Sequence, residues 1–209
     1  MEIELKYRIP GDEIAGKIWE NELFSDSEEE GSREELQLVA RYYDTAGRAL
    51  AGEGIAYRVR KEGEHYIATV KWQGESEEGL HSREELSIPV ADADAGIDVF
   101  SESRIGPKLQ ELTEGETLVC MMETVIERRR LRIDTGTGIF ELSVDKGQVR
   151  TSCGDEDILE AEVELFSGET EELISIGEKL QKKYSLEAED TSKYAKGLRL
   201  LCGQDPQDA

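Results

Sequence analysis

Two pairs of glutamates stand two residues apart in segments where apolar and charged side chains alternate. Glu2 and Glu4 lie in the opening stretch MEIELKYRI, and Glu162 and Glu164 lie in LEAEVEL, residues 159–165. A period of two is typical of a β-strand, so the members of each pair share one face. Carboxylate oxygens are hard donors that suit Mg²⁺ or Mn²⁺ better than zinc. Each pair is therefore a candidate metal-binding face.

Basic side chains alternate in the same way along other segments. Arg58 and Arg60 share a face in AYRVRK, and Arg128 and Arg130 share one in TVIERRRLRI. Cationic side chains suit phosphate oxygens, which arginine can bind through two parallel hydrogen bonds. The basic residues of these faces are Lys6, Arg58, Arg60, Lys71, Arg128 and Arg130. Carboxylates, a divalent metal and basic side chains together indicate phosphoryl-transfer chemistry, and an elongated polyphosphate suits a long binding channel.

The alternating and β-rich segments predict eight strands, mostly joined by short turns and therefore mostly antiparallel. The turn Glu62-Gly63-Glu64 predicts a tight hairpin. The predicted strands span residues 1–9, 36–44, 55–62, 65–74, 80–90, 119–133, 139–148 and 158–166. Helical periodicity predicts a short helix after Pro10, followed by an acidic loop, and further helices at 101–113, 169–184 and 191–201, with Thr170 as an N-cap.

One solvated face is the simplest explanation of the charges on any single strand. Taken together, the strands favour another explanation, because an eight-stranded sheet can close into a barrel that has an interior. If the apolar faces pack outward against helices, the ionic faces line the lumen. Buried unpaired charges are costly, so such a lumen must hold water, metal and ligand. We therefore predict an α+β fold: a closed eight-stranded antiparallel β-barrel, forming a tunnel, with helices packed outside.

The overall charge limits the possible partners. The chain has 209 residues, with 25 Lys and Arg against 48 Asp and Glu, for a net charge of -23. This charge disfavours binding to nucleic acid or to an anionic membrane surface. Salt screens electrostatic interactions over about 8 Å at physiological ionic strength, so a locally basic lining can still hold an anion despite the negative net charge. No apolar run approaches the ~20 residues of a membrane span, and no leader segment is evident, so we expect a cytoplasmic protein.

The remaining composition predicts one domain over residues 1–209, with 203–209 as a frayed tail. Cys120, Cys153 and Cys202 are widely spaced and odd in number, so we expect reduced thiols. Tyr42 and Tyr43 are expected to pack, and Asp44-Thr45 to shape a turn. His65 and His81 lie in or near predicted hairpin turns, and a catalytic role is not expected for either.

At these residues the sequence resembles the CYTH superfamily, the triphosphate tunnel metalloenzymes. One short charged motif alone would be weak evidence, whereas an ordered set on strands of matching parity is specific. The matching motifs, across residues 2–201, are Glu2 to Lys6 (ExExK), Tyr42 to Thr45 (YYDT), Arg58 to Arg60 (RxR), Thr69 to Lys71 (TxK), Arg83 to Glu85 (RxE), Arg128 to Arg130, Asp145 to Gly147 (DxG), Glu160 to Glu164 (ExExE) and Ser192-Lys193 with Gly197.

The stretches GLHSREE, LSVDKG, LEAEVEL and SKYAKG are most similar to the bacterial inorganic triphosphatase branch of that superfamily. A helical CHAD domain often follows in that branch. No sequence remains for it in these 209 residues, so we expect a stand-alone catalytic domain.

The resemblance implies roles for individual residues. Glu2, Glu4, Glu162 and Glu164 would hold divalent metal, with Glu85 and Asp145 assisting a second ion or a water. The side chains that would clamp the phosphates are Lys6, Arg58, Arg60, Lys71, Arg128, Arg130 and Lys193. The implied reaction is metal-dependent hydrolysis of the terminal phosphoryl group of inorganic triphosphate. Lys6, Glu4 and Arg58 are the candidate catalytic residues, and the general base is not identified.

Alternatives stay open at this point. The same superfamily contains class IV adenylate cyclases and thiamine triphosphatases, and a polyphosphate-binding module without turnover is a rival of another class. A homodimer is compatible with the sequence. Four further residues share the strand parity of the predicted lining: Arg8, Arg83, Arg132 and Glu160. They are left out of the candidate set because they could instead lie at the mouth of the tunnel.

Overall fold

The computed structural model describes residues 1–20, 23–94 and 96–202, without the side chain of Cys202; the predicted frayed tail lies outside these residues. The strands are β1 (Glu2–Arg8), β2 (Glu34–Asp44), β3 (Ala56–Glu62), β4 (His65–Glu77), β5 (Leu80–Val90), β6 (Val119–Asp134), β7 (Ile139–Thr151), β8 (Gly154–Ser167) and β9 (Glu187–Ala188). The helices are α1 (Asp12–Trp19), α2 (Ala49–Gly52), α3 (Gly106–Thr113), α4 (Thr170–Tyr184) and α5 (Lys193–Cys202), with a 3₁₀ turn at Ile97–Phe100.

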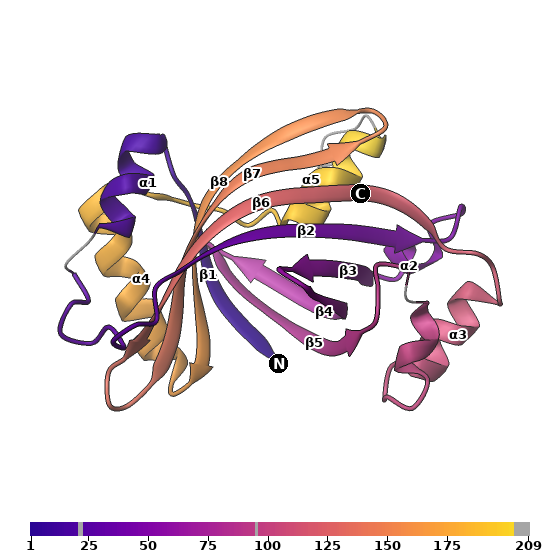
Figure 1. Cartoon of the computed structure of the whole chain (residues 1–209), viewed down its shortest axis with the longest axis horizontal. Coiled ribbons are helices and arrows are strands. Elements are labelled where there is room, and N and C mark those ends of the chain that lie inside the picture. The colour runs from indigo at the N-terminus through magenta and orange to yellow at the C-terminus, as the bar shows by residue number, and fades with distance from the viewer. Residues whose placement is uncertain (21–22, 95, 203–209) are drawn as a thin grey trace.

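The first strand closes the sheet into a barrel. The strand order is β5-β4-β3-β2-β6-β7-β8-β1, and β1 also pairs with β5, so the eight long strands form a continuous wall (Figure 1). Along β1, Glu2 pairs with Arg83 on one side, while Glu4 pairs with Glu164 on the other. Every pairing is antiparallel. The predicted closed eight-stranded antiparallel barrel is confirmed.

Outward-facing apolar residues bind the helices to this wall. Leu5 and Tyr7 of β1 pack in one cluster with Leu173, Ile176 and Leu180 of α4. A second cluster joins α2, the 3₁₀ turn and α3 to the outer faces of β3 and β4. Burial of one such large side chain contributes about 1.5–3 kcal/mol. The alternation along each strand therefore turns its ionic residues inward. Within the described part of the chain, no helix is long and apolar enough to cross a membrane.

The inner face is not ionic along its whole length. Where β2, β6, β7 and β8 extend beyond the ring, their inner positions become apolar, as at Met122 and Ile126. Helix α5 lies under this arch, and Tyr194, Leu198 and Leu201 pack on it (Figure 1). The C-terminal helix thus closes one end of the barrel, and the ionic lining occupies the remainder of the lumen.

Several local elements differ from their predicted bounds. Helix α2 was not predicted, because four residues cannot show helical periodicity; it depends on Asp44, whose carboxylate accepts hydrogen bonds from the Leu50 and Ala51 amides at 2.9 Å. The predicted helix at 101–113 begins only at Gly106. Thr170 is the first residue of α4, and the cap position is Glu169, which makes no side-chain capping bond. The turn between β7 and β8 is shorter than predicted, because β7 continues to Thr151 and β8 already begins at Gly154.

The contact between α4 and β1 gives a test of this packing. A Cβ added at Gly177 would meet the Leu5 Cδ1 and Tyr7 Oη atoms, whereas one added at Gly16 of α1 would meet nothing within 4 Å. We expect Gly177→Ala to lower the free energy of unfolding by about 1–3 kcal/mol, through overpacking. Gly16→Ala should raise it by about 0.5–1 kcal/mol, through helix propensity. Urea denaturation measures both, and a neutral Gly177→Ala would contradict the close approach.

Candidate active site

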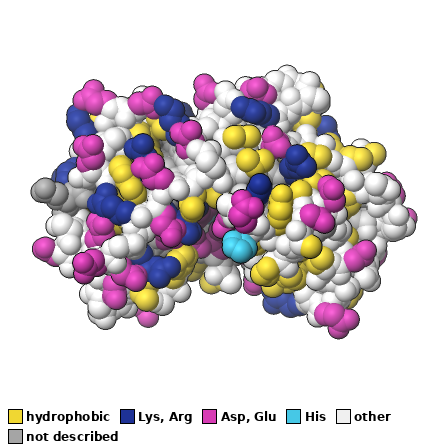
Figure 2. Space-filling model, viewed as in Figure 1, with side chains coloured by type: hydrophobic (Ala, Val, Ile, Leu, Met, Phe, Trp, Pro, Cys, Tyr) yellow, Lys and Arg dark blue, Asp and Glu magenta, His cyan; other side chains and the backbone are white. Residues whose placement is uncertain are grey.

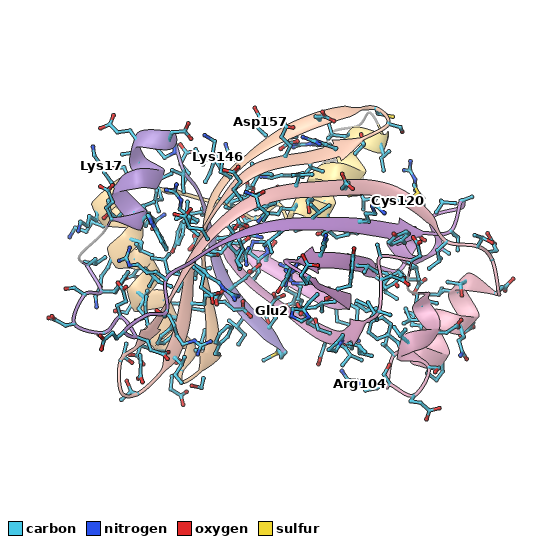
Figure 3. The ribbon with its side chains drawn as sticks, in the orientation of Figure 1. Glu2, Lys17, Arg104, Cys120, Lys146 and Asp157 are labelled. Carbon is cyan, nitrogen blue, oxygen red and sulfur yellow. The ribbon has the colours of Figure 1, made fainter. Side chains whose placement is uncertain are left out.

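The lumen contains a cavity of about 420 Å³. Among the described residues, eight basic and six acidic side chains line it. Every predicted site residue except Asp145 is in the lining: Glu2, Glu4, Lys6, Arg58, Arg60, Lys71, Glu85, Arg128, Arg130, Glu162, Glu164 and Lys193. Glu2 lies inside the ring of strands, whereas Lys17 and Arg104 lie at the periphery (Figure 3). On the outer face in view, both signs are interspersed (Figure 2).

Carboxylates gather on the adjoining strands β1, β8 and β7. We call Glu2, Glu4, Glu141 and Glu164 the acidic cluster. Glu164 pairs laterally with Glu4 on one side and with Glu141 on the other. Burial, together with the charges of Glu2 and Glu4, raises the pKa of Glu164 to about 8. Among the residues that the structure describes, Glu164 makes no ion pair. Glu164 is therefore the member of the acidic cluster without a compensating cation, whereas Glu2, Glu4 and Glu141 each have one.

Two arginines of β3 form the complementary basic pair, Arg58 and Arg60. Within the described ranges, Arg58 makes no ion pair with any carboxylate, and the Nε atoms of both arginines are buried without a hydrogen-bond partner. Burial, together with the neighbouring charge of Arg58, lowers the pKa of Arg60 to about 10. Unused donors and mutual repulsion indicate that an anion would be held here.

Glu162 is the centre of a network of ion pairs. Its carboxylate lies 2.6 Å from Arg128, 2.8 Å from Lys193 and 3.1 Å from Lys6. Lys6 in turn reaches Glu4 at 3.3 Å. Burial would raise the pKa of Glu162, but the charges of Lys193, Lys6 and Arg128 outweigh burial and hold that pKa well below its usual value. Glu162 is thus ionised and surrounded by cations.

Glu85 has a comparable partner on β4. Lys71 lies 2.7 Å from both Glu85 and Glu2. Burial opposes ionisation of Glu85, yet the charges of Lys71 and Arg58 lower its pKa to about 2. Lys71 therefore stands between the acidic cluster and the basic pair.

Asp145 is the one predicted site residue that the structure does not bring to the cavity. Its side chain is 1% exposed. Its two carboxylate oxygens accept hydrogen bonds of 2.7 Å from Arg128, and Lys193 lies 2.9 Å away. Asp145 stands behind these two cations and orients them toward the lumen.

The lining also contains residues outside the predicted set. Arg83 and Glu141 line the cavity, and their parity on β5 and β7 was the available signal. Tyr42 lines it as well, stacked on Tyr194 of α5 with ring centroids 5.4 Å apart. Its packing role agrees with expectation, but its hydroxyl bonds to Arg58, which sequence spacing could not indicate.

The donor set suits a divalent metal, although its carboxylates are not preassembled as a ligand cluster. Within residues 1–20, 23–94 and 96–202, no three His, Cys, Asp or Glu side chains converge in ligand geometry. Lys6, Lys71 and Arg83 instead hold the carboxylates of Glu2 and Glu4. Glu164, unpaired and crowded by like charge, is the position that a divalent cation would stabilise most, because oxygen donors and negative charge are what Mg²⁺ and Mn²⁺ prefer.

Comparisons with known proteins agree with this geometry. Residues 1–198 match the sequence profile of the CYTH domain family. An inorganic triphosphatase of Haemophilus influenzae is 26% identical over 165 residues, which cover 79% of this chain but 46% of that protein, so the chain spans about half of its curated relative.

Two examples illustrate the fold shared with solved structures. A proposed adenylyl cyclase of Hippeastrum with a dominant triphosphatase activity superposes with a TM-score of 0.66 and 18% identity, over 98% of this chain and 97% of that one. The Mimivirus capping enzyme triphosphatase superposes with a TM-score of 0.53 and 12% identity, over 86% of this chain and 87% of that one.

The crowding at Glu164 predicts a pH-dependent stability. A carboxyl group whose folded pKa is raised from 4.5 to about 8 stabilises the fold at low pH, and this contribution is lost as pH rises through about 8. In EDTA at pH 9, we expect the free energy of unfolding of Glu164→Gln to be about 1–2 kcal/mol higher than that of wild type. At pH 6 the difference should be smaller.

Urea denaturation at both pH values measures this difference. Asp155→Asn, which changes an exposed carboxylate on the same strand, is the control and should not alter the pH dependence. A Glu164→Gln protein that retains the wild-type pH profile would contradict the crowding.

Proposed function

Because the chain belongs to the CYTH family, we propose that it hydrolyses the terminal phosphoanhydride bond of inorganic triphosphate with the help of Mg²⁺ or Mn²⁺. The observation that carries the proposal is that one cavity holds two kinds of unused group: Glu164, which makes no ion pair among the described residues, and the basic pair, whose Nε donors have no partner. A metal–triphosphate complex supplies both missing partners at once. The proposed setting is the cytoplasm.

The charge of the lining favours the complex over either ion alone. Eight basic side chains exceed six acidic ones among the described residues, so the cavity is formally positive before any ligand binds. Free divalent metal meets Lys6, Lys71 and Arg83 on the carboxylates that it needs. Triphosphate carries several negative charges, attracts these cations and frees the carboxylates. We therefore expect the metal and triphosphate to bind cooperatively.

Each group of lining residues then has a role. Glu2, Glu4, Glu162 and Glu164 would hold the metal, with Glu85 nearby, and the metal would supply positive charge to the phosphate oxygens. Arg58 and Arg60 would bind phosphate through their free donors. Lys6, Arg128 and Lys193 lie on Glu162 in the cavity lining and would bind the same anion. Lys71 and Arg130 complete the basic lining, and Asp145 orients Arg128 and Lys193.

The positions of these donors before substrate binds are the physical source of the expected rate increase. Cations that are fixed by Asp145 and Glu162 need no reorganisation when charge develops on the phosphoryl oxygens. The closed wall keeps most bulk water away from these charges, which strengthens each interaction.

A substrate panel tests the proposal. We expect phosphate release from triphosphate with Mg²⁺ or Mn²⁺ to exceed release from ATP, thiamine triphosphate, pyrophosphate and long-chain polyphosphate, and EDTA to abolish it. Cyclic AMP from ATP would indicate a cyclase instead. Preference for thiamine or nucleoside triphosphate would move the activity to those substrates. Tight triphosphate binding without product over hours would indicate a binding module.

Arg58 gives the sharpest mutational test. Arg58→Ala should lower kcat/KM for triphosphate by about 100- to 1,000-fold, because it removes a preorganised donor. The melting temperature should stay close to wild type, since Arg58 makes no direct ion pair within the described part of the chain and its loss would leave no carboxylate there without its partner. Arg129→Ala is the matched control: Arg129 lies on β6 between two lining arginines, but its side chain is 47% exposed. Retained activity in Arg58→Ala would refute the proposed site.

A further inference from the structure

One of the two histidines of the chain is buried beside the acidic cluster. His81, on β5, is 4% exposed and pairs laterally with Glu4. Its Nε2 atom lies 2.8 Å from the carbonyl oxygen of Glu189, and its Nδ1 atom lies 3.4 Å from Arg83 Nη2. Both ring nitrogens therefore have hydrogen-bond partners. The sequence had indicated only that His81 lies in or near a turn, and no catalytic role was expected for it.

These two contacts determine the tautomer of the ring. A carbonyl oxygen can only accept, so Nε2 must carry the proton. A guanidinium can only donate, so Nδ1 must be unprotonated. His81 is thus a neutral imidazole that donates to Glu189 and accepts from Arg83.

Arg83 passes this constraint to the acidic cluster. The same Nη2 atom that donates to His81 also donates to Glu4 Oε1 at 3.0 Å. The Nε atom of Arg83 lies 3.2 Å from Glu2 Oε2. Arg83 therefore restrains both carboxylates of β1, and its own rotamer is restrained by the imidazole.

The other contact of His81 leads away from the cavity. Glu189 belongs to the segment that joins β9 to α5: its amide donates to the Lys6 carbonyl at 3.0 Å, and its carboxylate lies 3.0 Å from Lys196. This contact attaches the segment to the barrel wall. The two nitrogens of His81 thus have separable purposes, one toward the fold and one toward the cavity.

We propose that His81 is a positioning residue of the proposed active site: its Nδ1 atom orients Arg83, and Arg83 holds Glu2 and Glu4 in the arrangement that receives the metal–triphosphate complex. The inference rests on the proposed function for the identity of that ligand. The hydrogen-bond chain from His81 through Arg83 to the two glutamates is independent of it.

The tautomer is measurable without any ligand. In ¹⁵N spectra of the imidazole rings, only His65 and His81 contribute, and His65 is exposed. We expect His81 at neutral pH to show one protonated Nε2 and an unprotonated Nδ1, with His65 averaging between tautomers. A proton on Nδ1 of His81 would overturn the proposal, since Arg83 could not then donate to it.

Two substitutions separate the two contacts. The Oδ1 atom of Asn takes the place of Nδ1 and can accept from Arg83, whereas the amide nitrogen of Gln takes the place of Nε2 and can donate to Glu189. His81→Asn should therefore lose thermal stability but bind ligand within about twofold of wild type. His81→Gln should retain stability but bind about tenfold more weakly, as is typical when the partner of a metal ligand is lost.

The binding probe is Mn²⁺ together with imidotriphosphate, a P–N–P analogue that resists hydrolysis, followed by the electron paramagnetic resonance signal of free Mn²⁺. His65→Gln is the control and should match wild type. Equal affinities of the Asn and Gln variants, whether both retained or both lost, would overturn the positioning role. A wild-type protein that binds the probe and shows the expected tautomer, but releases no phosphate, would instead count against the proposed function alone.

Discussion

The pairing of β1 with two neighbours at once is the constraint on which the rest of the structure depends. β1 carries Glu2, Glu4 and Lys6 on a single face, and it joins β5 on one edge and β8 on the other. If either pairing were lost, the sheet would open and these charges could relax into solvent, where like charges cost little. Closure instead confines them opposite one another. The raised pKa of Glu164 and the unused donors of Arg58 and Arg60 follow from that confinement.

The lumen tolerates so many charges because most of them are paired internally. Glu162 lies among three cations, Glu85 has Lys71, and Asp145 has Arg128. Buried ion pairs contribute little net stability, because desolvation offsets their attraction. Their value is geometric: they hold long side chains in place before a ligand arrives. The fold is stabilised outside the lumen, by apolar clusters such as that between β1 and α4.

Strand parity made much of this predictable from the sequence. It identifies which face a side chain occupies, and a closed barrel makes one face the interior, so twelve predicted site residues line one cavity. Parity does not tell how far along the barrel a residue lies or what stands in front of it. For this reason Asp145 was expected in the lining although Arg128 and Lys193 cover it, and Arg83 was left out. His81 was missed because its contact with Glu189 spans 108 residues.

Helix α5 shows why stability and site geometry cannot be separated in this protein. Gly197 allows α5 to approach the inner face of β6 and β7 closely, since an added Cβ would meet the Met122 sulfur and, at 3.1 Å, Val149. That approach sets the position of Lys193, one turn earlier, which contacts Asp145, Glu160 and Glu162 within 2.8–2.9 Å. Apolar packing at the closed end of the barrel therefore determines where a cation stands in the lumen. A substitution on the apolar face of α5 that displaced the helix would therefore move Lys193 and alter the charge around Glu162.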